Sequence, residues 1–354
     1  MLLENGDVER LLTAEACIDA LEVAFRDLAE GRAVNRPRSH TCTPLGEGHW
    51  YLFKSMDGSI PRLGLHAIRL SSDHTHEFSR GGKRRREKLP AAPGGRYVGL
   101  VMLFDIHTLE PLAIIQDGHL QRMRVGCTSA LAAKYLSRPD SRVVALIGSG
   151  WQATTQLLGL RQVRDVREYR AYSTDPERLR IFSGDMSERL GQEVRAVRSS
   201  REAVDGADIV ACATNSHDPV LDGAWLAPGQ HVGSVQSHEL DWRTLERASL
   251  IAVRSREAAT FHHPPDQAPV EAAEVKRLDE RLRAKLVELG DVVVGRSGRR
   301  SPADITLFTG GGLGASSGLG IQFAAVGHAV YQAARAAGAG REIPTDWFLE
   351  TAKP

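Results

Sequence analysis

The chain has 354 residues, 42% of them hydrophobic and 25% charged, which is the composition and length of a globular protein with two domains. Lysine and arginine total 45 against 44 acidic residues, and the formal net charge of +1 argues against a general role on nucleic acid or a membrane surface. Its four cysteines lie apart without C-x-x-C spacing, so neither a zinc site nor a disulfide framework is indicated. Without a secretion signal or an apolar run long enough to cross a bilayer, we expect a cytoplasmic protein.

The first part of the chain predicts helices followed by an antiparallel sheet. Apolar residues recur at helical spacing over residues 8–33, with Thr13 as a helix start and Gly31 as a stop. Residues 36–70 change to short runs of period two, broken by Gly, Pro and Asp. One basic residue on a strand is usually a solvated side chain, whereas several that converge would bind an anion. The candidates for such convergence are Arg36, Arg38, Lys54, His66 and Arg69.

Residues 71–95 form a long polar segment that interrupts this pattern. The segment contains a basic run at residues 83–88 and ends in Pro and Gly. We expect a lid or a partner-contact loop whose charge faces phosphate or carboxylate groups, with a plain solvated loop as the alternative. His74, His76 and Glu77 make an incomplete ligand set, so we predict no metal site.

Strands are expected to resume at residues 97–105 and 112–115, followed by a helix over residues 121–138. Small residues along that helix would allow close backbone packing. Arg124 lies in its first turns, where the sheet and the following segment can meet. A buried arginine there would require an anionic ligand.

The most informative stretch is V-V-A-L-I-G-S-G-W-Q-A at residues 143–153. An apolar β-branched run that ends in G-x-G-x-x-A predicts a buried parallel strand turning into a dinucleotide-binding helix. Gly148 permits the turn, Gly150 leaves room for a pyrophosphate, and Ala153 keeps the helix close to its strand. Trp151 and Gln152 open the helix, whose N-terminus favours phosphate.

Strands and helices alternate after this turn, as in a doubly wound parallel sheet. We predict strands at residues 167–173 and 208–214, and helices at 176–191 and 200–206. Thr214 and Asn215 end a strand at the edge where such sheets bind ligands. His238 and Glu239 follow a later strand end and are acid–base candidates, with a helix cap and surface residues as the alternative.

The remaining chain is expected to be helical from residue 271 to 290, with a strand at 305–308 and a glycine-rich loop at 310–320. That loop lacks the Lys-Ser/Thr ending of a P-loop. A final packed helix is expected over residues 321–337.

Several of these segments resemble the ornithine cyclodeaminase and mu-crystallin family over nearly the whole chain. They include F-D-I-H-T-L-E-P-L-A-I-I-Q-D-G, R-V-G-C-T-S-A-L-A-A-K-Y-L-S-R, L-I-G-S-G-W-Q-A, A-D-I-V-A-C-A-T-N-S and G-L-G-I-Q. The resemblance implies an α/β protein. Residues 129–320 would form a Rossmann domain with a doubly wound parallel sheet. Residues 1–128 and 321–354 would form an α+β substrate and dimerisation domain with an antiparallel sheet. It also implies a homodimer.

The resemblance further implies hydride transfer between NAD or NADP and the α-carbon of an amino or imino acid. Arg124 aligns with the arginine that holds the substrate carboxylate, and Arg38 with a second one. The family's substrate lysine falls at His66, with Arg69 and Lys54 as stand-ins. An acid used by cyclodeaminases falls at Val235, and Phe323 stands where an aspartate is usual.

These departures favour reduction of an imino or keto acid, or its reverse, over cyclodeamination, which needs a carboxylate to relay protons. One alternative is a cyclodeaminase with a relocated acid, Glu239 or Asp241. The other is a non-catalytic cofactor or small-ligand binder like mu-crystallin.

The cofactor is expected to be NADP, with NAD as the alternative. The predicted second strand ends in Ser173 and Thr174 without an acid for the ribose 2'-hydroxyl, and with Arg178 they would receive a 2'-phosphate. The nicotinamide is expected near Thr214, Asn215 and Val235. Arg38 and Arg124 would hold the substrate, with His66, Lys54 or His238 as the proton donor.

Overall fold

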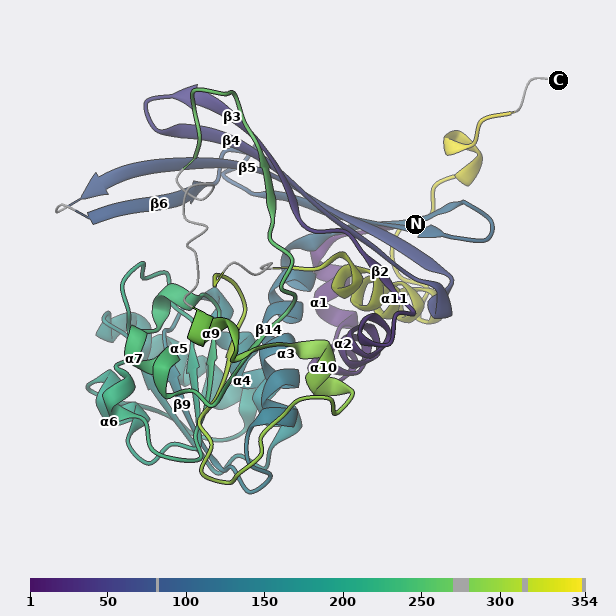
Figure 1. Cartoon of the computed structure of the whole chain (residues 1–354). Helices are drawn as coiled ribbons and strands as arrows, with labels where there is room; N and C mark the ends of the chain where they lie inside the picture. The colour runs from purple at the N-terminus through teal and green to yellow at the C-terminus, as the bar shows by residue number, and fades with distance from the viewer. Residues whose placement is uncertain (81–82, 270–279, 314–317, 352–354) are drawn as a thin grey trace.

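Two β-sheets and the helices packed on them organise the protein. The computed structural model describes residues 1–80, 83–269, 280–313 and 318–351. In Figure 1 a long sheet crosses the top of the molecule, α1, α2 and α11 lie beneath it, and a second sheet with its own helices lies at the lower left. The described residues contain no helix of the length and apolar character that a bilayer crossing requires.

The long sheet has the order β1-β8-β7-β5-β4-β3-β15, with β2 paired to β4 and β6 to β5. Its pairs are antiparallel except β1 with β8 and β15 with β3. Its strands are β1 (Leu2–Leu3), β2 (Val34–Asn35), β3 (Ser39–Gly46), β4 (His49–Ile60), β5 (Leu65–Arg80), β6 (Lys83–Leu89), β7 (Val98–Asp105), β8 (Pro111–Gln116) and β15 (Thr260–His262). The predicted antiparallel sheet is therefore present, with one further strand contributed from late in the chain.

The prediction of a loop at residues 71–95 is wrong, because β5 continues to Arg80 and pairs with β6 as a hairpin. Every second residue of β5 from Leu65 to Thr75 is buried, and the polar side chains of Arg69, Ser71 and Asp73 among them have specific partners. Asp73 is 3.4 Å from the Lys54 ammonium on β4 and 2.5 Å from that of Lys88 on β6. Strand pairing and ion pairs thus order a segment that its polarity alone would leave exposed.

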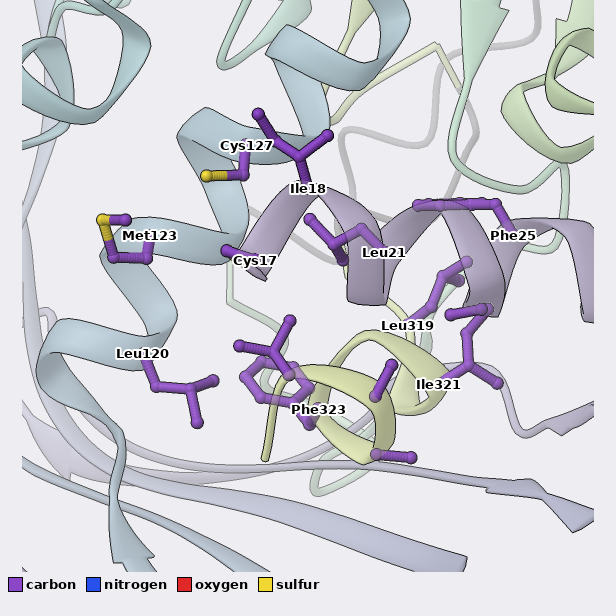
Figure 2. Close-up of a cluster of buried hydrophobic side chains, with 14 of the residues drawn as sticks. Cys17, Ile18, Leu21, Phe25, Leu120, Met123, Cys127, Leu319, Ile321 and Phe323 are labelled. Atoms are coloured by element: carbon purple, nitrogen blue, oxygen red, sulfur yellow. The ribbon is translucent and has the colours of Figure 1, made fainter. Parts of the chain in front are cut away.

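Helices cover the buried face of the long sheet. They are α1 (Asn5–Leu11), α2 (Ala14–Ala29), α3 (Asp117–Leu136) and α11 (Gly320–Ala337). The Thr13 hydroxyl accepts a hydrogen bond from the Ala16 backbone N–H and begins α2 as expected. Figure 2 shows the core where α2, α3 and α11 meet above the sheet; the side chains labelled there are Cys17, Ile18, Leu21, Phe25, Leu120, Met123, Cys127, Leu319, Ile321 and Phe323.

The second sheet is parallel throughout and has the order β11-β10-β9-β12-β13-β17-β14-β16. Its strands are β9 (Val143–Ile147), β10 (Glu168–Tyr172), β11 (Val194–Ala196), β12 (Ile209–Cys212), β13 (His231–Ser234), β14 (Leu250–Val253), β16 (Leu286–Glu288) and β17 (Thr306–Thr309). Alternate residues of β9 enter separate apolar clusters, so both faces of the sheet are covered. The strand order reverses between β9 and β12, as a doubly wound Rossmann sheet requires.

The helices of this part are α4 (Trp151–Val163), α5 (Pro176–Leu190), α6 (Ser200–Val204), α7 (Trp242–Arg247), α9 (Glu280–Arg283) and α10 (Leu289–Val293). The prediction of a continuous helix over residues 271–290 is wrong within the described part, because Leu286–Glu288 pairs with β14 as a strand. Residues 271–279 lie outside the described residues, as do residues 314–317 of the predicted glycine-rich loop.

Close packing of α3 against α4 connects the two sheets. A Cβ on Gly126 would lie 2.4 Å from the Thr155 carbonyl carbon, and one on Gly159 would lie 2.8 Å from the Ala130 Cβ. Neither position has room for a side chain. The small residues of α3 thus allow the close backbone approach that we predicted. This packing positions Arg124, on the same helix, next to the parallel sheet.

Candidate functional site

The glycine turn after β9 has the geometry of a phosphate-binding loop. Gly148 has φ of +118°, and a Cβ there would lie 2.3 Å from the Ala213 carbonyl oxygen, so only glycine fits. Gly150 precedes α4, where no side chain of the described residues caps the helix. Nothing lies within 4 Å of a Cβ placed on Gly150. Backbone N–H groups at the start of α4 therefore border open space, as a dinucleotide pyrophosphate requires.

The other residues of the turn differ in how far they are buried. Ala153 is fully buried and holds α4 against the sheet. Trp151 is 54% exposed, and the Arg122 guanidinium carbon lies 5.5 Å from its ring centroid. Gln152 is half-buried.

Ser173, Thr174 and Arg178 lie beyond the end of β10, the strand beside β9. Ser173 is half-buried, while Thr174 and Arg178 are exposed. The Asp175 carboxylate accepts a hydrogen bond from the Arg178 backbone N–H at 3.0 Å and caps α5. The nearest acid to the strand end therefore serves as a helix cap.

Glu239 anchors the loop that follows β12. Its Oε1 accepts hydrogen bonds from the backbone N–H and the hydroxyl of Thr214, at 2.6 and 2.8 Å, and its Oε2 accepts one from the Gln236 N–H at 3.0 Å. The carboxyl is fully buried, and burial raises its pKa although these hydrogen bonds oppose the shift. Glu239 thus positions Thr214 at the carboxyl edge of the sheet.

The other residues predicted at this edge differ in their exposure and in their hydrogen-bond partners. Asn215 is exposed, and the Val235 N–H donates to the Cys212 carbonyl after β13. His238 is half-buried and stacks on His217, with ring centroids 5.0 Å apart. Asp241 caps α7 through hydrogen bonds from Thr244 and Gly223. Glu239 and Asp241 are therefore both bonded to local backbone.

Two buried arginines lie between α3, α11 and the long sheet. Arg69 on β5 pairs with Asp117 at 2.6 Å. Arg124 on α3 donates to the side-chain oxygen of Gln121, at 2.8 and 3.0 Å, and to that of Gln322 at 3.3 Å. Arg124 is 3% exposed and Arg69 is 8% exposed.

Phe323 packs against both of these guanidinium groups. Its ring centroid lies 5.0 Å from the guanidinium carbon of Arg124 and 5.7 Å from that of Arg69. The side chain belongs to the core shown in Figure 2 and is fully buried. An aromatic face attracts both cations without neutralising either charge.

Two further arginines, Arg38 and Arg254, are close enough to Arg124 to affect its pKa. Arg38 donates from Nε to the His40 ring at 2.5 Å, and Arg254 follows the end of β14. Burial, and then repulsion from Arg254, Arg69 and Arg38, lowers the pKa of Arg124 well below its ordinary value. Burial and repulsion from Arg38 lower the pKa of Arg254 to about 9. The structure thus brings Arg38, Arg69 and Arg124 together and adds Arg254.

The register of β4 and β5 separates the predicted proton donors. Lys54 pairs with Ser71, and Met56 with Arg69, so Lys54 lies on the same sheet face as Arg69. His66 is three residues before Arg69 on the same strand and therefore lies on the opposite face, where its Nδ1 is 2.7 Å from the Ser59 hydroxyl. The structure does not bring His66 to the arginine cluster.

Sequence reasoning missed Arg254 and Asp117 as members of this cluster. Arg254 is a charged residue directly after a buried apolar strand, a signal as strong as the one that drew attention to Thr214. Asp117 begins α3, which starts before the helix expected from residue 121. The described residues contain no group of three or more His, Cys, Asp or Glu side chains able to hold a metal ion.

Comparison with known proteins gives several similar enzymes. A Delta(1)-pyrroline-2-carboxylate reductase of Bacillus cereus (strain ATCC 10987 / NRS 248) is 31% identical over 251 residues, covering 69% of this chain and 74% of the relative. The structure of the Thermococcus litoralis Delta(1)-pyrroline-2-carboxylate reductase with NADH and L-proline matches with a TM-score of 0.76 and 27% identity, covering 97% of this chain and 100% of that one.

An archaeal alanine dehydrogenase dimer with bound NAD matches with a TM-score of 0.75 and 26% identity, over 97% of this chain and 98% of that one. The model of the ornithine cyclodeaminase/mu-crystallin family matches residues 1–338. The glycine turn, the buried arginines and these matches together show that the chain belongs to the ornithine cyclodeaminase/mu-crystallin family.

Proposed function

We propose that this protein is an NAD(P)-dependent oxidoreductase that reduces the C=N bond of an imino acid, or carries out the reverse oxidation of an amino acid. The observation that carries the proposal is that the guanidinium groups of Arg69 and Arg124 are buried together against the Phe323 ring, with Arg38 and Arg254 close enough to lower the pKa of Arg124. Such a cluster favours an anionic ligand. Enzymes similar to this chain act on pyrroline-2-carboxylate and alanine, which are carboxylates.

Arg124 and Arg38 would grip the α-carboxylate, and the two glutamines on Arg124 fix its guanidinium plane. NAD(P)H bound at the glycine turn would supply the hydride, with its two electrons, to the imine carbon. Lys54 is the proton donor that the register favours, because it shares a sheet face with Arg69 and has a charged partner in Asp73. Positioning by these groups would be the main catalytic contribution.

Reduction is favoured over cyclodeamination by the contacts of Glu239 and Asp241. Both acids accept hydrogen bonds from local backbone, and each holds a loop or a helix end. A carboxylate that relays protons to a substrate amine needs direct access to that amine. The residues proposed for a relocated acid are therefore better explained as structural.

NADPH is the cofactor we propose, with NADH also accepted. The Asp175 carboxylate caps α5, and Ser173, Thr174 and Arg178 follow the end of β10, where we expect the ribose to bind. Arginine and hydroxyl groups suit a 2'-phosphate, whereas an acid bonds a 2'-hydroxyl. The bound NADH and NAD of the similar structures are the reason to test both cofactors.

We also propose a homodimer, with residues 129–320 as the dinucleotide-binding domain and residues 1–128 and 321–354 as the substrate and dimerisation domain. The face of the long sheet opposite α2 and α11 carries apolar side chains that remain partly exposed in the single chain: Ile68, Leu70, Leu100, Met102, Phe104 and Ile114. A second subunit would bury them.

The test is an NADPH and NADH oxidation screen with Delta(1)-pyrroline-2-carboxylate and with pyruvate or oxaloacetate plus ammonium. We expect steady turnover of at least one compound. Cofactor fluorescence changes without turnover of any compound would instead support the binding protein. Ammonia release from ornithine or lysine would support the cyclodeaminase.

A further inference from the structure

We propose that Phe323 is a positioning residue, whose ring holds the Arg124 guanidinium in place for the substrate carboxylate and leaves the positive charge of that arginine available. The inference rests on the proposed function, because it takes Arg124 to be a carboxylate-binding residue. It assigns a role in substrate binding to a core side chain that has no polar atom and acts through its neighbour.

The two arginines beside Phe323 differ in their charged partners. Arg69 pairs with the Asp117 carboxylate at 2.6 Å, whereas Arg124 forms no ion pair within the described part of the chain. Arg124 donates instead to the neutral side-chain oxygens of Gln121 and Gln322. Its side chain is buried, so little water solvates the charge. Such a guanidinium needs an interaction that stabilises a cation without consuming its charge.

The Phe323 ring supplies this interaction. Its centroid lies 5.0 Å from the guanidinium carbon of Arg124 and 5.7 Å from that of Arg69, within the roughly 6 Å over which an aromatic face attracts a cation. The face is electrostatically negative, but the ring has no net charge. An acid at this position would pair with Arg124 and compete with the substrate carboxylate, whereas the ring leaves the charge for the substrate.

Backbone contacts at the start of α11 fix the position of the ring. A Cβ on Gly320 would overlap the Asp57 carbonyl group of β4, and one on Gly58 would lie 2.8 Å from the Ile321 backbone nitrogen. The backbones of α11 and β4 are therefore in direct contact, without room for a side chain between them. Phe323 itself is fully buried in the core shown in Figure 2. The ring cannot leave the arginine unless the helix moves.

The residue before Phe323 contacts the same guanidinium. The Gln322 side-chain oxygen accepts hydrogen bonds from Arg124 at 3.3 Å and from the Leu319 backbone N–H at 3.0 Å. Its side-chain nitrogen donates to the Thr128 hydroxyl on α3 at 2.7 Å. Helix α11 thus holds Arg124 by a hydrogen bond and by an aromatic ring. Weakening the ring contact alone should loosen the guanidinium without releasing it.

The experiment changes the electrostatics of the ring with little change in its shape. Amber suppression replaces Phe323 with mono-, di- and trifluorinated phenylalanine, because each fluorine withdraws electron density from the ring face and weakens its attraction for a cation. The probe is L-proline, titrated calorimetrically in the presence of NADH, the pair in the Thermococcus litoralis complex. We expect the Kd for L-proline to rise with each fluorine, by about 2- to 30-fold in total, the range of a cation–π contact.

Phe25→Leu is the matched control for the loss of a buried ring. Phe25 is fully buried in the same core, but among the described residues its ring contacts no guanidinium. Phe323→Leu and Phe25→Leu should both lower the thermal unfolding temperature, whereas only Phe323→Leu should weaken L-proline binding. NADH affinity, measured by fluorescence, should stay unchanged in every variant. A constant Kd for L-proline across the fluorinated series, or equal weakening by Phe25→Leu, would overturn the proposal.

Binding and turnover together separate this inference from the proposed function. Stepwise weakening of L-proline binding without turnover of any amino or imino acid would refute the oxidoreductase and leave the role of Phe323 in place. Where a substrate is turned over, the fluorinated series should raise KM and leave kcat nearly unchanged, because the carboxylate is held equally in the ground and transition states. Failure of both L-proline and L-alanine to bind the wild-type protein would refute the inference, because Arg124 would then lack a carboxylate ligand of this class.

Discussion

Replacing Gly150 with alanine tests whether the glycine turn binds a dinucleotide. Gly150 has φ of −88°, which any residue adopts, and a Cβ there meets nothing within 4 Å. We therefore expect the Gly150→Ala protein to fold normally, with a change in unfolding free energy of about 1 kcal/mol or less for the altered helix cap. The added methyl group would instead occupy the space that a pyrophosphate needs.

The expected loss in affinity follows from the hydrogen bonds that the phosphate would lose. A hydrogen bond to a charged group contributes about 1.5–3 kcal/mol, so the Kd for NADPH should rise about 10- to 100-fold. Gly148→Ala is the contrasting variant. Its Cβ would lie 2.3 Å from the Ala213 oxygen at a φ of +118°, and we expect it to lose about 2–5 kcal/mol of stability.

Fluorescence titration with NADPH and NADH gives the two affinities, and thermal or denaturant unfolding gives the stabilities. The reasoning requires that Gly150→Ala weaken binding without loss of stability and that Gly148→Ala lose stability. A folded Gly150→Ala protein that binds both cofactors with wild-type affinity would show that the nucleotide lies elsewhere.

Three further substitutions test the arginine cluster and the loop beside it. Arg124→Gln should lower kcat/KM about 10- to 100-fold, because it removes one charged contact to the substrate carboxylate, as steady-state kinetics would measure. Phe323→Leu should lower the unfolding free energy by about 2–4 kcal/mol, because it removes buried volume and the ring facing Arg69 and Arg124. Burial raises the pKa of Glu239 above its ordinary value of 4.5, so folding favours the protonated carboxyl. Its contribution to stability should therefore fall as the pH rises from 4.5 through the raised pKa, and Glu239→Gln should abolish that change in pH-dependent unfolding.

Each of these expectations has a distinct contrary result. Wild-type kcat/KM in Arg124→Gln would remove this arginine from the substrate site. A Phe323→Leu protein as stable as wild type would mean that the aromatic ring does not support the cluster. If Glu239→Gln retains the full pH dependence of the wild-type protein, another group is responsible for it.

Local sequence signals were sufficient for the glycine turn and the doubly wound sheet. Residues 143–153 combine an apolar strand, two glycines and a small residue in one short stretch, so the turn follows from neighbours in the chain. The opposite faces of His66 and Arg69 also follow from a local rule, since residues three apart on a strand point to opposite sides. The spacing of these two residues therefore separates their side chains wherever this strand pairs.

Strand pairing decided what the sequence pattern could not. Residues 71–80 and 83–89 look like an exposed polar loop, yet β5 and β6 pair because Asp73 finds ammonium groups on the neighbouring strands. Leu286–Glu288 lies in a predicted helix, yet it forms the edge strand beside β14. In both cases, backbone hydrogen bonds to a neighbouring strand override the local preference.

The sequence by itself determined that this chain has a dinucleotide-type turn, an alternating parallel sheet and a separate antiparallel sheet, because each follows from the periodicity of adjacent residues. Only the tertiary structure decided that the buried residues Arg69, Arg124 and Arg254 and the half-buried Arg38 lie in one region. They are separated by up to 216 residues in the chain, from 38 to 254. Strand order, strand register and the close contact of α3 with α4 bring them together, and none of these is encoded in a short stretch of sequence.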